Sequence, residues 1–482
     1  MIRKLLIIST CLFSLFGNKC SREDDTKKDQ LKETLIAVFA DNQIAPLSTN
    51  YQNFLKNHLK LCKEKNVDVI MIPGDLVNNA LAIDYEYFEN DLIEIYGEDE
   101  SKYPEFVYTM GNHEWWDTSE KVDDNAVKLY YKHARIDTSS LRRKTDMSPD
   151  DKGRYTYGNY YKVFNGIPFF SISGENESGL ISSFLATEIK SWLKEVYELP
   201  SVKAGGPIFF NYHYAFPNVT YSFGQGSVAR AQELYNIIKD YPQIILFSGD
   251  THFSGVNERT INQVDITTIN LGSSSYSRHV SRSVTMESYE QFENITKNSV
   301  SKDLLTGEVA VNYDKTPHIH FVKVDNQGNT TINRYFSANN VSDAKHLGLE
   351  WQIPAHSNKN NFTYTSDRYE NKEWANKLYG KDGLSWNDDA QLNYTFTDNQ
   401  LTVSFPDVSD YNCCEHYRIK VTSSKDEVSK YDFVSHYYKY EDNSHNYAFS
   451  VNNIEYSSIK KVEVYAYDFF DNISINHLEK QN

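Results

Sequence analysis

Cysteine is scarce in this chain of 482 residues, which contains only five of them. Cys11 and Cys20 fall in the N-terminal segment, so only Cys62, Cys413 and Cys414 remain in the body of the chain. Three cysteines do not make a disulfide framework, and the fold must therefore be stabilised by its hydrophobic core. We expect the neighbours Cys413 and Cys414 to be free thiols, because Cα atoms about 3.8 Å apart would strain a bond between them.

An excess of positive charge is also missing. The chain has 49 Lys and Arg residues against 66 Asp and Glu residues, which gives a net charge of −17. This charge excludes a general attraction to nucleic acid, and we expect no nucleic-acid partner. An acidic protein that handles anionic substrates needs a local positive centre, which a metal cluster can supply.

The chain also lacks a hydrophobic run long enough to be a convincing membrane span. The apolar stretch LLIISTCLFSLFG follows Arg3-Lys4 and is too short for this purpose. It resembles a bacterial lipoprotein signal, so we expect residues 1–20 to direct export, Cys20 to be lipidated and residues 21–33 to form a disordered tether. A simple cleaved signal is the alternative. The protein would then be secreted or anchored at the cell surface in the outer membrane, and would contact the membrane only through this anchor.

Alternating patterns in the body of the chain predict two kinds of domain. Residues 34–340 alternate apolar strand-like runs with helical spacing, which is typical of an α/β domain, although the polar residues 276–316 suggest a long loop or insertion. Residues 341–384 are expected to be a connecting region. Residues 385–482 show short strands with period-two alternation, which predicts an antiparallel β-sandwich, and its last strands resemble a fibronectin type III-like module.

Polar residues follow five successive predicted strands, in the stretches FADNQ, PGDLVNN, MGNHEWW, NYHY and SGDTH. Ligands of open α/β sheets gather outside the carboxyl ends of strands, so we expect these side chains to converge. Gly74, Gly111 and Gly249 are expected to let the backbone turn sharply there. Asp, Asn and His without Cys suit divalent ions such as Mn²⁺, Fe²⁺ or Zn²⁺, and do not resemble a closed structural zinc site.

Each polar residue also has a simpler explanation when taken alone. Asp75 or Asp250 could cap a helix, His213 could be a buried core histidine, and Asn112 could hold a turn. These explanations would all have to hold at five strand ends together, so we favour one shared site. The aromatic residues on the same loops could line a substrate groove or pack the loops onto the domain: Trp115, Trp116, Tyr214, Phe216, Tyr221 and Phe223.

The five blocks, in this order, resemble the calcineurin-like metallophosphoesterases over roughly residues 34–335. The resemblance implies a four-layer α/β/β/α domain and a dinuclear metal site. It also implies hydrolysis of phosphomonoester or phosphodiester bonds by attack of a metal-bridging hydroxide. The predicted export signal would place this reaction outside the cytoplasm.

The resemblance implies a role for each matching residue. The first metal would be bound by Asp41 and His252, the second by Asn112 and His213, and Asp75 would bridge the two. His113 would contact the phosphate or protonate the leaving oxygen, a role that suits imidazole, and Glu114 would orient it.

Two positions depart from the family pattern. Gln43 stands where a histidine ligand of the first metal is common, and Asp250 stands where a histidine ligand of the second metal belongs. An amide oxygen and a carboxylate can both coordinate hard ions. We therefore expect two divalent metals, drawn from Mn, Fe, Zn or Mg, with Mn or Fe favoured.

The substituted ligands leave a second interpretation open, in which the chain is a non-catalytic surface binding protein on a degenerate phosphoesterase scaffold. For the favoured enzyme, the expected partner is a phosphoester substrate, either a small molecule or a lipid headgroup. We expect the protein to be a monomer.

Overall fold

The computed structural model describes most of the chain beyond the N-terminal segment. It covers residues 30–116, 126, 129–130, 132–133, 141–144, 158–216, 219–221, 228–281, 300–302, 309–314, 317–337, 341–369, 383–397, 400–409, 413–435, 437, 446–452 and 459–482. The predicted signal, with Cys20, and most of the predicted tether lie outside these residues. No helix in the described parts is both long and apolar enough to span a bilayer.

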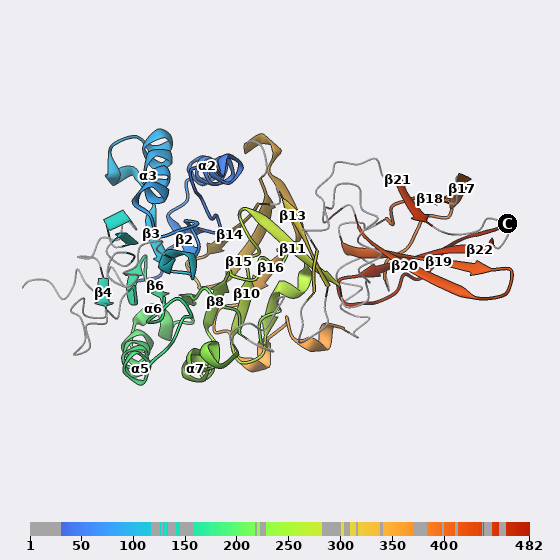
Figure 1. Cartoon of the computed structure of the whole chain (residues 1–482). Coiled ribbons are helices and arrows are strands. Elements are labelled where there is room, and N and C mark those ends of the chain that lie inside the picture. The colour runs from blue at the N-terminus through green and yellow to red at the C-terminus, as the bar shows by residue number, and fades with distance from the viewer. Residues whose placement is uncertain are drawn as a thin grey trace, which may run out of the picture.

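The first sheet has six strands in the order β16-β15-β14-β1-β2-β3 (Figure 1). Strands β1, β2 and β3 are mutually parallel, and β14, β15 and β16 are added in turn, each antiparallel to the strand before it. The bounds are β1 (Thr34–Val38), β2 (Val69–Pro73), β3 (Glu105–Thr109), β14 (His318–Val324), β15 (Thr330–Phe336) and β16 (Lys345–Ile353).

The second sheet has seven strands in the order β4-β5-β6-β7-β8-β10-β9, with a parallel centre from β6 to β10. Its central strands are continuous apolar runs, as expected for strands that are covered on both faces. The bounds are β4 (Leu141–Lys144), β5 (Tyr160–Phe164), β6 (Ile167–Ser171), β7 (Ile208–Asn211), β8 (Ile244–Ser248), β9 (Ile261–Gln263) and β10 (Thr267–Asn270).

The two sheets pack face to face, and helices cover their outer faces. Ile36 and Val38 of β1 lie in a core with Phe209 of β7 and Phe247 of β8, whereas Ala37 lies in the core beneath the helices. This alternation follows from the two-residue period of a strand. Figure 1 shows α2 and α3 on one side of the strands and α5 and α7 on the other. The four-layer α/β/β/α arrangement is confirmed.

Apolar residues at helical spacing form the buried face of the longer helices. In α2 the buried Phe54, Leu55, Leu59 and Cys62 fall on one face, and the Ser182 side chain caps α5 by accepting from the Leu185 amide. The α-helices are α2 (Thr49–Glu64), α3 (Ala82–Tyr96), α5 (Ser183–Tyr197), α6 (Pro200–Lys203) and α7 (Val228–Ile238). Single-turn 3-10 helices occur at η1 (Glu100–Lys102), η2 (His113–Trp115), η3 (Glu258–Thr260), η5 (Val341–Asp343), η6 (Lys359–Asn361) and η7 (Ser366–Tyr369).

Two segments contain strands that the sequence pattern did not predict. The expected loop 276–316 contributes a separate three-stranded sheet of β11 (Tyr276–Ser281), β13 (Val309–Asp314) and β12 (Val300–Lys302), which corrects that prediction. These strands are short and polar, so they give no apolar run. Strand β16, in the expected connecting region 341–384, is the edge of the first sheet, and only alternate residues of it are buried.

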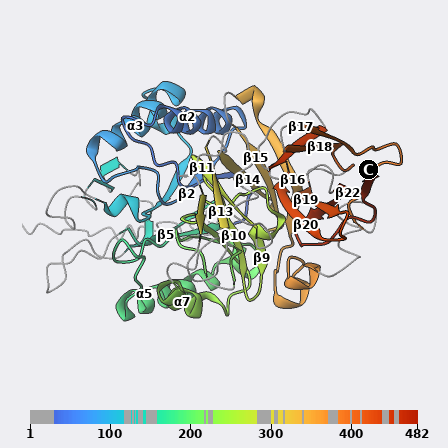
Figure 2. The same cartoon turned by 45° about the vertical axis from the view of Figure 1, so that its right-hand side comes forward.

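The C-terminal strands form two antiparallel sheets that share one hydrophobic core (Figure 2). The three-stranded sheet is β17 (Asn393–Thr397), β18 (Gln400–Pro406) and β21 (Asn446–Asn452). The four-stranded sheet is β20 (Val428–Val434), β19 (Cys414–Ser423), β22 (Ile459–Asp468) and β23 (Leu478–Gln481). Strands β17 and β18 pair antiparallel, and the buried neighbours Cys413 and Cys414 are not joined to each other by a disulfide, as expected.

The sandwich packs against the α/β domain at the segment that follows β8. Val256 of this segment belongs to the hydrophobic core of the sandwich. The Asn257 amide donates to Glu415 over 3.4 Å, and the Arg259 guanidinium lies 3.3 Å from the Asp471 carboxylate. The sandwich therefore contacts the same chain segment that carries the last predicted site residues.

Candidate metal centre

The backbone at five predicted ligand positions adopts the left-handed conformation. This region of φ is uncommon for residues other than glycine, and such residues concentrate at functional sites. The φ values are 56° for Asp41, 47° for Gln43, 55° for Asp75, 65° for Asp250 and 52° for His252. The strand ends thus hold an unfavourable backbone conformation at the positions whose side chains the sequence predicted to converge.

Three of the ligands that the sequence predicted form a compact buried group, which we call the inner cluster. Its members are Asp41, Asp75 and His213. One ligand atom from each lies within 4.8 Å of the other two, and all three residues are buried. The Oδ2 atom of Asp41 finds no hydrogen-bond partner among the described residues. A buried carboxylate oxygen without a donor is costly, so the inner cluster fits a cation that the oxygen would bind.

His213 is oriented as a metal-binding histidine usually is. Its Nδ1 atom donates to the Pro73 carbonyl over 2.8 Å, which directs Nε2 into the inner cluster. Nε2 lies 3.4 Å from Asp75 Oδ2 and 3.0 Å from the side-chain oxygen of Asn112. Anchoring one ring nitrogen on a backbone carbonyl fixes the tautomer that presents the other nitrogen to a metal.

The charges of the inner cluster favour a cation at this position. Burial alone would raise the pKa of Asp75, but the adjacent His213, and then His113, holds that pKa at about 2. Burial would lower the pKa of His213, but Asp75, with Asp41 and Asp250, raises it well above its usual range. A proton on His213 therefore balances the carboxylates in the metal-free protein, and a divalent cation would displace it.

The glycines beside the site serve two different purposes. Gly74 has a φ of 94° and makes the sharp turn that we expected. Gly111 and Gly249 do not have positive φ, and are needed for space instead. A Cβ atom at Gly111 would lie 2.2 Å from Asp75 Oδ1, and one at Gly249 would lie 2.3 Å from Asp41 Oδ2.

His113 lies at the edge of the inner cluster with one ring nitrogen facing it. The Nδ1 atom donates to the Asn78 carbonyl over 2.7 Å, and the backbone amide donates to Asp75 Oδ1 over 3.0 Å. Nε2 is 3.7 Å from Asp75 Oδ2 and 3.1 Å from the Gln43 amide nitrogen. The Asn78 carbonyl, which the sequence could not point to, therefore orients His113.

Glu114 does not orient His113, and the structure corrects that prediction. Its carboxylate accepts from the backbone amides of Asp75 (2.8 Å), Val77 (3.2 Å) and Gly111 (2.7 Å), and from the Tyr108 hydroxyl (2.6 Å). Burial and the charge of Asp75 raise the pKa of Glu114. Glu114 thus fastens the loop after β2 to the loop after β3, a contact set that sequence spacing does not reveal.

The remaining predicted ligands surround the inner cluster. His252 Nε2 lies 3.3 Å from Asp41 Oδ1, and the Gln43 amide nitrogen lies 3.3 Å from the same His252 atom. Asp250 donates its backbone amide to Asp41 Oδ1 over 3.0 Å, while its own carboxylate is 3.9 Å from His213 Nε2 and 37% exposed. We call Gln43 and Asp250, the two departures from the family pattern, the outer pair.

The structure also shows supporting groups that the sequence did not identify. The hydroxyls of Ser273 and Ser275 donate to the Asp41 carbonyl over 3.0 Å and 2.8 Å. Both serines lie in the loop after β10, which is another strand end, and this position in the sequence could have identified them as part of the site. Of the loop aromatics, Trp115, Tyr214 and Phe216 are buried, Trp116 is exposed and Phe223 lies outside the described residues.

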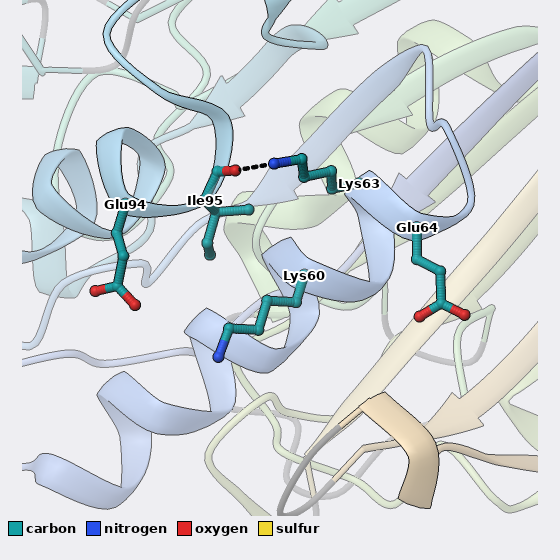
Figure 3. A pocket seen from close by; sticks show the side chains of 5 residues that line it. All are labelled: Lys60, Lys63, Glu64, Glu94 and Ile95. Atoms are coloured by element: carbon teal, nitrogen blue, oxygen red, sulfur yellow. Dashed lines mark hydrogen bonds between the residues drawn. The ribbon is translucent and has the colours of Figure 1, made fainter.

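A pocket of about 510 Å³ lies elsewhere, between α2 and α3 (Figure 3). Lys60, Lys63 and Glu64 line it from α2, and Glu94 and Ile95 line it from α3. The Lys63 ammonium donates to the Ile95 carbonyl, and no predicted site residue is present. Its mixed charges hold no convergent set of ligands, so the metal centre is the candidate functional site.

Comparison with known proteins agrees with this fold. Residues 34–254 match the family model described as calcineurin-like phosphoesterase. A search of curated proteins gives no match. The two facing sheets have the architecture of a metallophosphoesterase α/β domain, and this part of the chain is similar to a calcineurin-like phosphoesterase.

Several solved structures are similar at low identity. A dimetal phosphatase from Danio rerio matches with a TM-score of 0.40 and 9% identity, over 68% of this chain and 100% of that chain. A purple acid phosphatase from yellow lupin (Lupinus luteus) seeds matches with a TM-score of 0.40 and 12% identity, over 67% and 54%. The anchor protein of the Plasmodium inner membrane complex matches with a TM-score of 0.39 and 14% identity, over 68% and 90%.

Proposed function

We propose that the chain is a metal-dependent phosphoesterase that hydrolyses phosphomonoester or phosphodiester bonds at this centre. The observation that carries the proposal is the inner cluster, in which two buried carboxylates and one histidine converge and Asp41 Oδ2 has no donor within the described part of the chain. The family match over residues 34–254 supports the reaction class.

The residues divide between two cation positions that share Asp75. We assign Asp41, Gln43 and His252 to one position, and Asn112, His213 and Asp250 to the other, with Asp75 between them. Two divalent cations, when bound, activate a water molecule and offset negative charge on the phosphoryl oxygens. We propose Mn or Fe rather than Zn or Mg, because the donor set has no thiolate and contains several carboxylates.

His113 supplies the proton that the leaving oxygen needs. Because Nδ1 is occupied by the Asn78 carbonyl, Nε2 is the ring atom that can hold a transferable proton on the side of the inner cluster. A protonated imidazole is a general acid that can release this proton to an alkoxide leaving group.

An assay of the purified protein tests this function. Hydrolysis of 4-nitrophenyl phosphate and bis(4-nitrophenyl) phosphate is measured with Mn²⁺ added, with chelator, and for Asp75→Asn. We expect turnover that requires metal and that Asp75→Asn abolishes. Turnover unaffected by both chelator and Asp75→Asn would contradict the assignment.

Binding without turnover is the second candidate, and the outer pair favours it because both of its members depart from the family pattern. A wild-type protein that binds a divalent metal but hydrolyses no phosphoester with any of these metals would support that candidate.

We further propose the setting in which this enzyme acts. The N-terminal pattern supports export and anchoring at Cys20, with a monomer acting on a small-molecule or lipid-headgroup phosphoester outside the cytoplasm. We propose that the sandwich is a fibronectin type III-like module, which seven antiparallel strands in two sheets support. Release of the protein from membranes by Cys20→Ser would test the anchor.

A further inference from the structure

Trp116 differs from the other aromatic residues that follow the strand ends. Trp115, Tyr214 and Phe216 are at most 5% exposed and pack in the hydrophobic cores. Trp116 is 45% exposed, although it lies in the same loop as Trp115. A large indole left in solvent gains nothing from core packing, so its position calls for another explanation.

The indole is held against the proposed proton donor. The ring centroids of Trp116 and His113 are 4.0 Å apart, with the planes inclined at 41°. The Trp116 amide donates to the His113 carbonyl over 3.2 Å, and its own carbonyl accepts from the Ala80 amide over 2.9 Å. Both sides of the backbone are therefore fixed, and the indole is presented from a constrained turn rather than from a free loop.

The loop that ends at Trp116 is held by the two neighbouring strand-end loops. The loop after β1 is bonded to the loop after β2 through the Asn78 amide and the Ile44 carbonyl at 2.9 Å, and Ala80 connects the latter to Trp116. The three loops that follow β1, β2 and β3 therefore fix the position from which the indole is exposed.

We propose that Trp116 stacks on a planar ring in the leaving group, and that the enzyme prefers phosphoesters of aromatic or ring-bearing alcohols. This inference rests on the proposed function. Because His113 gives its proton to the leaving oxygen, the leaving group departs on the side of His113, where the indole lies. Trp116 contacts the leaving group and not the phosphoryl group, so it determines specificity without taking part in the chemistry.

A comparison of two substrates in three proteins tests the proposal. The value of kcat/KM is measured for 1-naphthyl phosphate and for glycerol 2-phosphate, with wild type, Trp116→Ala and Trp116→Phe. For each substrate, dividing the kcat/KM of the variant by the kcat/KM of wild type cancels the intrinsic reactivity of that substrate. We expect Trp116→Ala to lose about tenfold with the naphthyl ester and less than about twofold with the glycerol ester. Trp116→Phe keeps a ring and should stay within about threefold for both.

Equal losses with both substrates, or no loss with either, would overturn the proposal. Inhibition by inorganic phosphate serves as the control for the phosphoryl site, and its constant should not change in Trp116→Ala. An equal loss together with weaker phosphate inhibition would mean that Trp116 only supports His113.

The failure of the proposed function is seen separately, in wild type. If wild type hydrolyses neither ester, the phosphoesterase assignment is wrong, and binding then decides the role of Trp116. Calorimetric titration with naphthylphosphonate and with methylphosphonate needs no turnover. Tighter binding of the naphthyl compound that disappears in Trp116→Ala would support stacking, and equal binding of both would refute it.

Discussion

The inner cluster and the outer pair lie side by side in one site, but they differ in how completely the protein holds them. Asp41, Asp75 and His213 are buried, and protein groups orient each of them. Of the outer pair, Gln43 directs its amide nitrogen at His113 and His252, and Asp250 leaves its carboxylate partly in solvent. Asp250 is therefore the predicted ligand of the outer pair whose side chain the fold constrains least, whereas Gln43 is buried like the inner cluster.

This difference indicates where substitution is tolerated in such a site. A residue whose oxygen has no other partner and whose neighbours leave no space cannot change without loss of the cation. A residue at the edge can change its ligand type, because solvent can complete the coordination. The predictions below test this contrast, beginning with the largest expected effect.

Asp75→Asn should lower kcat/KM at least about 1000-fold, because a neutral amide cannot balance two cations. The measurement is hydrolysis of bis(4-nitrophenyl) phosphate at saturating Mn²⁺, with metal content determined on the same sample. Retention of more than a tenth of the wild-type activity would contradict the difference between the inner cluster and the outer pair, since the inner cluster would then be dispensable.

Glu114→Gln should lower the free energy of unfolding by about 2–3 kcal/mol, because the new amide group faces buried backbone amides as a second donor. Urea denaturation followed by circular dichroism gives the difference. Glu198→Gln, at an exposed residue, is the matched control and should change the stability by less than about 0.5 kcal/mol. Equal effects of the two changes would mean that Glu114 does not fasten the two loops.

Affinity for the cation that His213 binds should rise about tenfold between pH 6 and pH 7, because that cation must displace one proton from His213. The raised pKa of His213 means that its pairing with Asp75 stabilises the metal-free fold below about pH 6.5. This contribution is lost as the pH rises through the raised value. Titration with Mn²⁺ at the two pH values measures the affinity, and a flat profile would show that His213 binds no metal.

Asp250→Asn should lower kcat/KM only about fivefold and weaken one of two metals, in contrast to the same change at Asp75. Because the Asp250 side chain is partly exposed, solvent screens the loss of its charge and a water molecule can take the place of its oxygen. The same assay and elemental analysis as for Asp75→Asn apply. An effect as large as that of Asp75→Asn would place Asp250 in the inner cluster and remove the distinction between the two groups.

The sequence allowed much of this site to be predicted, because Asp, Asn and His after parallel strands must meet at one sheet edge. It could not show the left-handed backbone at Asp41 or Asp250, which depends on hydrogen bonds between loops far apart in the chain. It also misassigned Glu114, since the carboxylate next to His113 in sequence points to the backbone of another loop. Polar edge strands such as β12 carry too few apolar residues to be recognised by alternation.

Metal content is the most direct measure of the central claim that the strand ends hold two cations. The chain from residue 21 onward is purified, dialysed against trace Mn, Fe, Zn and Mg, and analysed for each element, beside Asp75→Asn and Asp250→Asn. We expect two equivalents in wild type, enriched in Mn or Fe, about one in Asp250→Asn and none in Asp75→Asn. One equivalent or none in the wild type would contradict the account.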